Sequence, residues 1–213
     1  SGQQLQAISY YFQALRALEK HLGEAIRVTY DGREILLVNE IYASLQSALN
    51  GIVLLANPAE INVNRRIQDG SHALLIKAAF AGSGKPVEAL PLFASFGKGS
   101  GDIFPSYKTN PAGETKILLN KISSKEIDQS IVVKVDLDAL NGAGNSGVYG
   151  LIVKTLKLPQ VQINLKVERP LVFLSSEERS FGVRRANAQL SNRLRNLLAT
   201  NGFEFTEDKN NAD

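Results

Sequence analysis

The feature that most constrains this chain is a change in the spacing of its hydrophobic residues near position 59. Before that point they recur every three or four positions, which places them on one face of a helix. The residues in this series are Leu5, Ile8, Phe12, Leu15, Leu18, Leu22, Ile26, Val38, Ile41, Leu45, Leu49 and Ile52. After that point hydrophobic and polar residues alternate, as in residues 131–137 and 163–167, which is typical of half-buried strands. The sequence therefore predicts an α+β protein.

Residues 1–58 are predicted to form an antiparallel helical hairpin. Asp31 and Gly32 mark a turn between the two helices. The second helix is expected to end near Asn57, because Pro58 cannot continue the hydrogen-bond ladder. Such a hairpin has more hydrophobic surface than two helices can hide from water, so we expect it to pack against another part of the protein.

Residues 59–169 are predicted to form a β-sandwich. Six short runs with strand character are separated by glycine-rich turns, a pattern typical of stacked sheets. The runs are 61–64, 74–80, 87–96, 115–119, 131–137 and 163–167. Pro91 interrupts one of them and suits an edge strand or a bulge. Residues 141–150 hold four glycines and are expected to be a mobile loop.

Residues 170–213 are predicted to form a partial α/β unit. A strand at 171–174 is followed by a helix at 186–200 and by a second strand starting at 203. One β-α-β unit is too small to enclose its own core. It is either the start of a further domain or a unit packed on the sandwich or on the hairpin.

The amino-acid composition limits the chemistry and the binding partners that we expect. Cysteine is absent, which excludes disulfides, thiol catalysis and cysteine-ligated zinc. The 24 basic and 21 acidic residues are scattered, so nucleic-acid binding has little support. Methionine is also absent and the chain opens on Ser1, so either a leader has been removed or the chain is a piece of a longer protein. A signal peptide or a lipid-attachment cysteine would then lie upstream.

Two features of the middle region resemble bacterial immunoglobulin-like modules. The first is the proline-bearing run from Lys85 to Leu92, and the second is the turn from Thr109 to Gly113. Those modules carry a strand of the type G-x-P-V-x-G-x-P-V and a T-D-x-x-G turn. Here Ala89 stands where glycine is usual, and Asn110 stands where aspartate is usual. Either side chain at position 110 can bond to the backbone just ahead and shape the turn. The resemblance implies an immunoglobulin-like β-sandwich.

The order of the predicted elements is similar to the middle of bacterial envelope lipoproteins of the flagellar-assembly and curli-secretion group. The similarity includes the C-terminal pattern V-F-L-S-S-E-E, then L-x-x-L-L-A-x-x-G-F, which ends at Phe203. It implies an extracytoplasmic structural component of the periplasm or the outer-membrane surface, without an active site. Contact with the membrane is then expected only through a lipidated segment outside this chain.

Candidate chemical groups are few, and we expect no catalytic, cofactor-binding or metal site. His21 and His72 fall in different predicted units, without an evident nucleophile or metal partner. Asp136 and Asp138 are expected on one side of a strand, and Asp102 and Asp128 at an end of the sandwich. These acids lack the EF-hand spacing and suit a solvated face better than a calcium site. The glycine clusters at 82–84 and 99–101 lead into strands rather than a helix, so they suit turns better than a phosphate loop.

The candidate interaction surface consists of Tyr10, Tyr11, Arg184 and Arg185. The two tyrosines lie at least partly off the hydrophobic stripe of the first helix, which is a sign of packing against another domain or subunit. The two arginines flank the start of the last helix, where a solvated face is the main alternative to an acidic partner.

The leading hypothesis is a non-catalytic structural or protein-interaction module of a bacterial cell-envelope protein involved in assembly. Protein partners or self-association are expected, with no nucleic acid and no cofactor. One alternative is a subunit of an extracellular filament or pilus-like assembly. Another is a carbohydrate-binding β-sandwich, although tryptophan, a common sugar platform, is missing.

Overall fold

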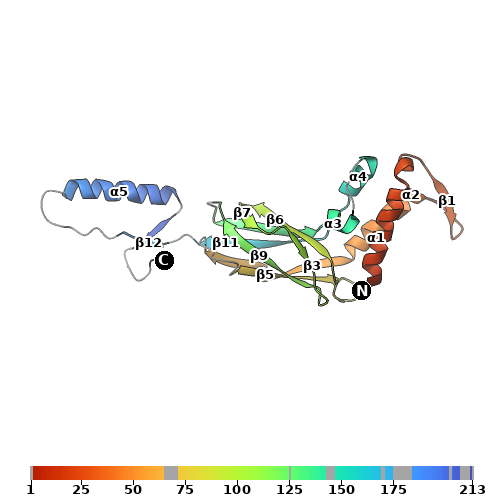
Figure 1. The fold of residues 1–213 in the computed structure, drawn as a ribbon, viewed down its shortest axis with the longest axis horizontal. Coiled ribbons are helices and arrows are strands. Elements are labelled where there is room, and N and C mark those ends of the chain that lie inside the picture. Colours follow the sequence, from red (N-terminus) through yellow and green to blue (C-terminus); the bar gives the residue numbers. More distant parts are fainter. Residues whose placement is uncertain are drawn as a thin grey trace.

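The computed structural model describes residues 2–64, 72–124, 126–142, 147–168, 171–174, 184–201, 203–206 and 212. Figure 1 shows the N-terminal helices at one end, the packed sheets in the middle and the C-terminal strand and helix at the other end. Within the described residues no helix is both long and apolar enough to cross a bilayer.

The N-terminal part consists of two helices joined by a β-hairpin, and we call residues 2–50 the arm. Its elements are α1 (Gly2–Ala17), the short 3-10 helix η1 (Glu19–His21), β1 (Arg27–Tyr30), β2 (Arg33–Leu36) and α2 (Leu37–Asn50). The two helices pack against each other. Their inward faces hold fully buried side chains, namely Ile8, Phe12, Leu15, Leu45 and Leu49. The arm therefore shares one hydrophobic core cluster with the sandwich.

Both predicted helices are shorter in the structure than the sequence pattern indicated. The first helix ends at Ala17, and β1 and β2 pair where a short loop was expected. Asp31 (φ 47°) and Gly32 (φ 71°) adopt the left-handed region, which a two-residue hairpin turn requires. The second helix ends at Asn50, and β3 (Ile52–Asn57) follows. Its β-branched and leucine-rich run pairs with a neighbouring strand, and this pairing outweighs its helical spacing.

Two sheets form the sandwich. One has the order β3-β5-β9-β7 and the other has the order β4-β11-β10-β6-β8. The remaining strands are β4 (Glu60–Asn64), β5 (His72–Phe80), β6 (Pro91–Lys98), β7 (Gly101–Ile103), β8 (Ser106–Lys108), β9 (Glu114–Ile122), β10 (Asp128–Val135) and β11 (Gln160–Glu168). Residues 52–57 thus belong to the sandwich, although they precede the boundary expected at residue 58.

The strand order is that of an immunoglobulin-like sandwich. Its first strand is divided between the sheets, because β3 pairs antiparallel with β5 while β4 pairs parallel with β11. Strands β5 to β10 then alternate between the two sheets, and β11 pairs beside β10, so each sheet contains strands that are distant in sequence. Pro91 is the first residue of β6, where a missing N–H is tolerated, rather than part of an edge strand.

The connection between β10 and β11 differs from its prediction. It contains two short helices, α3 (Leu137–Asn141) and α4 (Gly147–Lys154), where we expected the end of a strand and a mobile loop. Asp136 caps α3, because its carboxylate accepts a hydrogen bond from the Ala139 N–H at 3.0 Å. Asp136 and Asp138 therefore do not share a strand face. Residues 143–146 of the expected loop lie outside the described residues.

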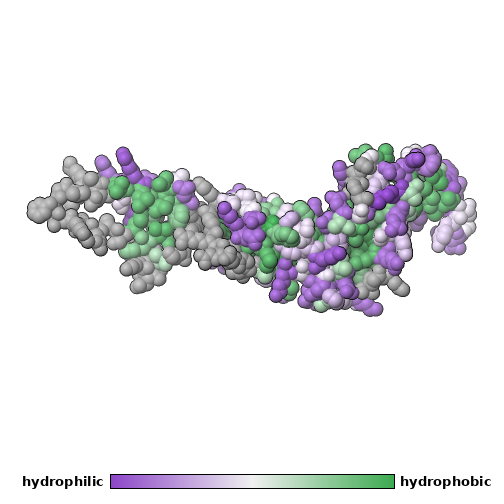
Figure 2. Space-filling model, in the orientation of Figure 1, coloured by the Kyte–Doolittle hydropathy of each residue, from purple (hydrophilic) through white to green (hydrophobic). Residues whose placement is uncertain are grey.

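The C-terminal unit contains β12 (Leu171–Phe173), α5 (Arg184–Thr200) and β13 (Glu204–Thr206). The two strands pair in parallel, and α5 lies between them in the sequence. Figure 2 shows hydrophobic side chains gathered over this unit. Exposed leucines of α5 contribute to them, namely Leu190, Leu194 and Leu197.

Candidate functional site

The structure places the two predicted tyrosines in different environments. Tyr10 is 56% exposed on α1, and its hydroxyl accepts a hydrogen bond from Gln6 Nε2 at 2.9 Å. Tyr11 packs against the core cluster instead. Arg184 and Arg185 begin α5, but their side chains lie outside the described residues. Of these four residues, Tyr10 is the one whose side chain the structure places on the exposed surface.

A buried polar cluster connects the arm to the sandwich. Asn141 Oδ1, at the end of α3, accepts hydrogen bonds from the Tyr149 hydroxyl at 2.6 Å and from Arg16 Nη2 at 3.0 Å. The Arg16 guanidinium also lies over the Tyr149 ring, 5.3 Å from its centroid. Tyr149 is 2% exposed and Asn141 is 9% exposed, so these bonds form out of bulk water. A buried, satisfied cluster of this kind favours one orientation of the arm.

Burial raises the pKa of the Tyr149 phenol above its ordinary value, and the nearby positive charge of Arg16 counteracts part of that effect. The phenol therefore stays protonated, and able to donate to Asn141, at neutral pH.

A second set of contacts connects α2 to the segment after α4. The Gln46 amide bonds to the Lys157 backbone twice, donating to its carbonyl at 2.9 Å and accepting from its N–H at 2.8 Å. The Tyr42 hydroxyl lies 2.9 Å from the Thr155 hydroxyl. Both helices of the arm are thus fixed to the connection between β10 and β11, which supplies the support expected for the helical pair.

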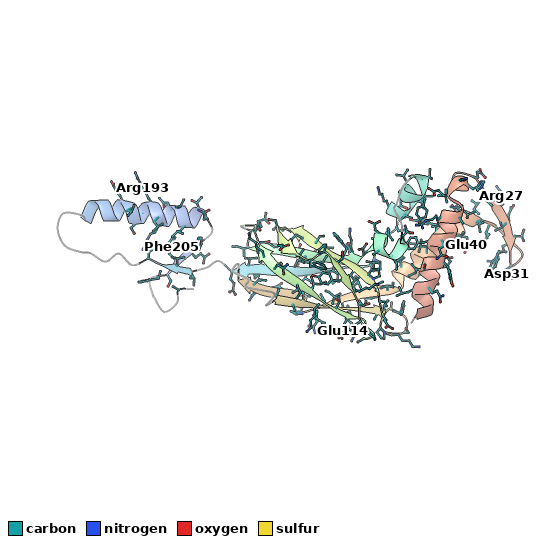
Figure 3. All side chains as sticks on the ribbon, in the orientation of Figure 1. Arg27, Asp31, Glu40, Glu114, Arg193 and Phe205 are labelled. Carbon is teal, nitrogen blue, oxygen red and sulfur yellow. The ribbon has the colours of Figure 1, made fainter. Side chains whose placement is uncertain are left out.

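The arm carries a second exposed aromatic residue that the sequence analysis did not identify. Tyr30 is 73% exposed at the end of β1, next to the hairpin turn. An ion pair between Arg27 and Glu34, at 3.2 Å, crosses the two strands of this hairpin. Figure 3 shows Arg27 and Asp31 on the hairpin, which projects from the side of α1 and α2 away from the sandwich. The signal in the sequence was an aromatic residue directly before an Asp-Gly turn.

The other candidate groups are dispersed. His21 pairs with Glu24 at 2.9 Å on the exposed surface of η1. His72 begins β5, and its side chain lies outside the described residues. Asp102 and Asp128 lie on β7 and β10, which belong to different sheets. Within the described part of the chain, no three side chains of metal-binding type come together. The glycine cluster at 82–84 lies between β5 and β6, and the cluster at 99–101 leads into β7, which begins at Gly101.

Two hollows open on the five-stranded sheet and its connection. One, of about 250 Å³, is lined by residues that include Lys98, Asp128, Ser130 and Asn164. The other, of about 310 Å³, lies beside Phe93, and Lys134 and Asp136 also line it. These linings offer hydrogen-bonding groups and charged side chains of both signs.

Comparison with known proteins does not assign the chain to a family. No protein-family model matches the chain, and no curated protein matches it significantly. One similar solved structure is WR4, a C. elegans member of the MSP family, with 10% identity and a TM-score of 0.33; the match covers 55% of this chain and 98% of WR4. Another is the D00-D0 domain of intimin, with 18% identity and a TM-score of 0.26; it covers 38% of this chain and 36% of that one. Such low TM-scores support no statement about function.

Proposed function

We propose that this chain is a non-catalytic protein-binding module whose docking surface is the arm. The observation that carries the proposal is the exposure of Tyr10 and Tyr30, 56% and 73%, on a segment held to the sandwich at two places. Tyrosine is enriched at protein interfaces and binds well when it is already positioned, because less conformational entropy is then lost on binding. The sandwich serves as the support.

The proposal includes no catalytic step. Two threonine hydroxyl groups with short hydrogen bonds have structural partners: Thr109 donates to the Val87 carbonyl at 2.6 Å, and Thr155 donates to the Ile152 carbonyl at 2.7 Å. Neither hydroxyl faces an imidazole that could act as a base. These contacts support a scaffold role.

We further propose that the module belongs to a bacterial cell-envelope protein and works in assembly outside the cytoplasm. The support is the order of the elements, which runs from a helical arm through an immunoglobulin-like sandwich to a β-α-β unit. Fractionation of cells that express the full-length gene product tests the location, and recovery in the cytosolic fraction alone would contradict it.

The binding proposal is tested by changing both exposed tyrosines of the arm, Tyr10→Ser and Tyr30→Ser, in one variant. The immobilised wild-type chain and the variant are incubated with an envelope extract, and the retained proteins are quantified by mass spectrometry. The matched control is Leu118→Ser, an equally simple removal of an exposed hydrophobic side chain (41% exposed) on the sandwich. We expect the tyrosine variant to lose a specific partner at least about 10-fold. Equal retention by all three chains would refute the proposal.

A further inference from the structure

The two sheets of the sandwich end in four edge strands, and three of them are protected. Strands β7 and β8 are only three residues long, and β4 carries the exposed polar residues Glu60 and Asn62. Short or polar edges discourage pairing with another chain. The fourth edge strand, β3, is six residues long and contains neither a charged residue nor a proline.

Hydrophobic side chains occupy both faces of β3. Ile52 and Leu54 face the core and are 3% and 6% exposed. Val53 and Leu55 point to the solvent side and are 38% and 55% exposed. An exposed hydrophobic edge is a template for adding another strand.

The backbone of β3 also has an open side. The Ala81 N–H donates to the Gly51 carbonyl at 2.9 Å, and the antiparallel register continues from Ile52 opposite Phe80. Since backbone groups alternate along a strand, those of Val53 and Leu55 face β5. The N–H and C=O groups of Ile52, Leu54 and Ala56 therefore point away from β5. Among the described strands none pairs with β3 on that side.

We propose that β3 pairs antiparallel with β3 of a second copy of this chain, around a two-fold axis at Leu54. If both sandwiches extend one continuous sheet, residues directly opposite each other must lie on the same face. Every second register meets this condition, and the one that pairs all three outward residues places Leu54 opposite Leu54, Ile52 opposite Ala56 and Val53 opposite Leu55. It joins the outward backbone groups in about six hydrogen bonds.

The charge distribution favours a second copy as the occupant. The pairing segment is uncharged, so identical strands meet without repulsion. The nearest charged side chain on the same face is Lys77, opposite Leu55 on β5, and it is neutralised within its own copy by Glu114 at 3.5 Å. A two-fold arrangement uses the same patch on both copies and closes, which is the commonest form of homo-oligomer.

This inference deepens the proposed function by naming one partner and a surface separate from the arm. The two proposals can fail independently, because the tyrosines of the arm take no part in the β3 pairing.

The test compares the full chain with two single variants by sedimentation velocity over a wide concentration range. In Leu55→Glu the new carboxylate lies opposite Lys77, so the monomer tolerates it, whereas the dimer would bury it against Val53 of the second copy. The matched control is Leu118→Glu, also an exposed leucine of this sheet but on β9, away from the β3 edge. Thermal unfolding checks that both variants fold.

We expect a reversible monomer–dimer equilibrium for the wild-type chain and for Leu118→Glu, and at least a 10-fold weaker dimer for Leu55→Glu. Amide exchange of Ile52, Leu54 and Ala56 should slow as the concentration of the wild-type chain rises. A wild-type chain that stays monomeric throughout, even if it pairs with a strand of another protein, overturns the inference. Open-ended filaments, or equal weakening in both variants, also overturn it.

Discussion

Asn110 shows how a single side chain sets the path of the backbone between β8 and β9. Its Oδ1 atom accepts hydrogen bonds from the N–H groups of Ala112 and Glu114, both at 2.9 Å. The chain then passes through Gly113 at φ 74°, where an added Cβ would collide with the Ala78 carbonyl. The sequence predicted this turn, because Asn and Asp both bond to the backbone just ahead.

Replacing Asn110 with alanine should lower the free energy of unfolding by about 1–2 kcal/mol, because two backbone bonds lose their acceptor. Asn110→Asp keeps the oxygen and should stay close to the wild type. Urea unfolding measures both variants, and an alanine variant as stable as the wild type would contradict the assigned role.

Tyr149 provides a pH-dependent prediction. Its pKa is raised in the folded protein, whereas an unfolded tyrosine ionises near pH 10. The unfolded chain therefore loses this proton first, so the stabilisation is complete below about pH 10 and is lost as pH rises through the folded pKa.

The free energy of unfolding of the wild-type chain should accordingly fall above about pH 10, and that of Tyr149→Phe should fall less steeply. Tyr107, whose pKa burial also raises, remains in both chains and cancels in the comparison. Denaturant unfolding between pH 8 and pH 11 measures the slopes. Identical slopes for the two chains would show that Tyr149 has the same pKa in the folded and the unfolded state, which would contradict the prediction.

At the scale of elements, the arm shows what hydrophobic spacing predicts and what it leaves open. Leu22 follows the helical series and does pack against the core, although the chain has left the helix by then. Spacing thus identified a side chain that is partly buried against the core, while the Asp-Gly hairpin and the pairing of β3 determined the backbone. The strands β5, β9 and β11 were predicted in part, as the shorter runs 74–80, 115–119 and 163–167, and strict alternation of hydrophobic and polar residues marks only the last of them.

The candidate site was less predictable than the fold. Tyr10 could be identified because it departs from the helical stripe. The contact that fixes the arm could not be identified from the sequence, because Arg16 and Asn141 are 125 residues apart and become neighbours only in the folded chain. The helices α3 and α4 were hidden by a glycine-rich composition typical of loops.

The contact between α2 and the segment after α4 gives a prediction at this scale. Gln46→Ala removes both bonds to Lys157 and should lower the free energy of unfolding by about 1–2 kcal/mol. The Lys157 amide should also exchange faster, as measured by NMR. Gln13→Ala is the control, because that side chain reaches only Ser9, at 3.5 Å on the same helix. Equal exchange at Lys157 in both variants would contradict the assignment.

At the scale of the whole molecule, the arm is held at two places on an immunoglobulin-like sandwich, and we propose that it binds a partner protein. Figure 1 shows α3 and α4 between the sheets and the helices of the arm. Asn141 makes its contacts at the end of α3, and Gln46 contacts the segment after α4. Rotation of the arm would therefore have to break a buried cluster as well as two hydrogen bonds to the backbone. The positioned arm and the open β3 edge are the two separate surfaces that we propose as binding sites.

The most direct test of this fixed arrangement is a distance distribution between the arm and the sandwich. Glu40 on α2 and Glu114 on β9 are labelled in Figure 3. The chain has no cysteine, so Glu40→Cys and Glu114→Cys place spin labels at these two sites only. The labelled chain is diluted into an excess of unlabelled chain, so that distances between the copies of the proposed dimer do not contribute. Pulsed electron paramagnetic resonance should then give one narrow distance, which broadens when Asn141→Ala and Gln46→Ala are added. A broad or multiple distribution in the chain that keeps Asn141 and Gln46 would contradict the account.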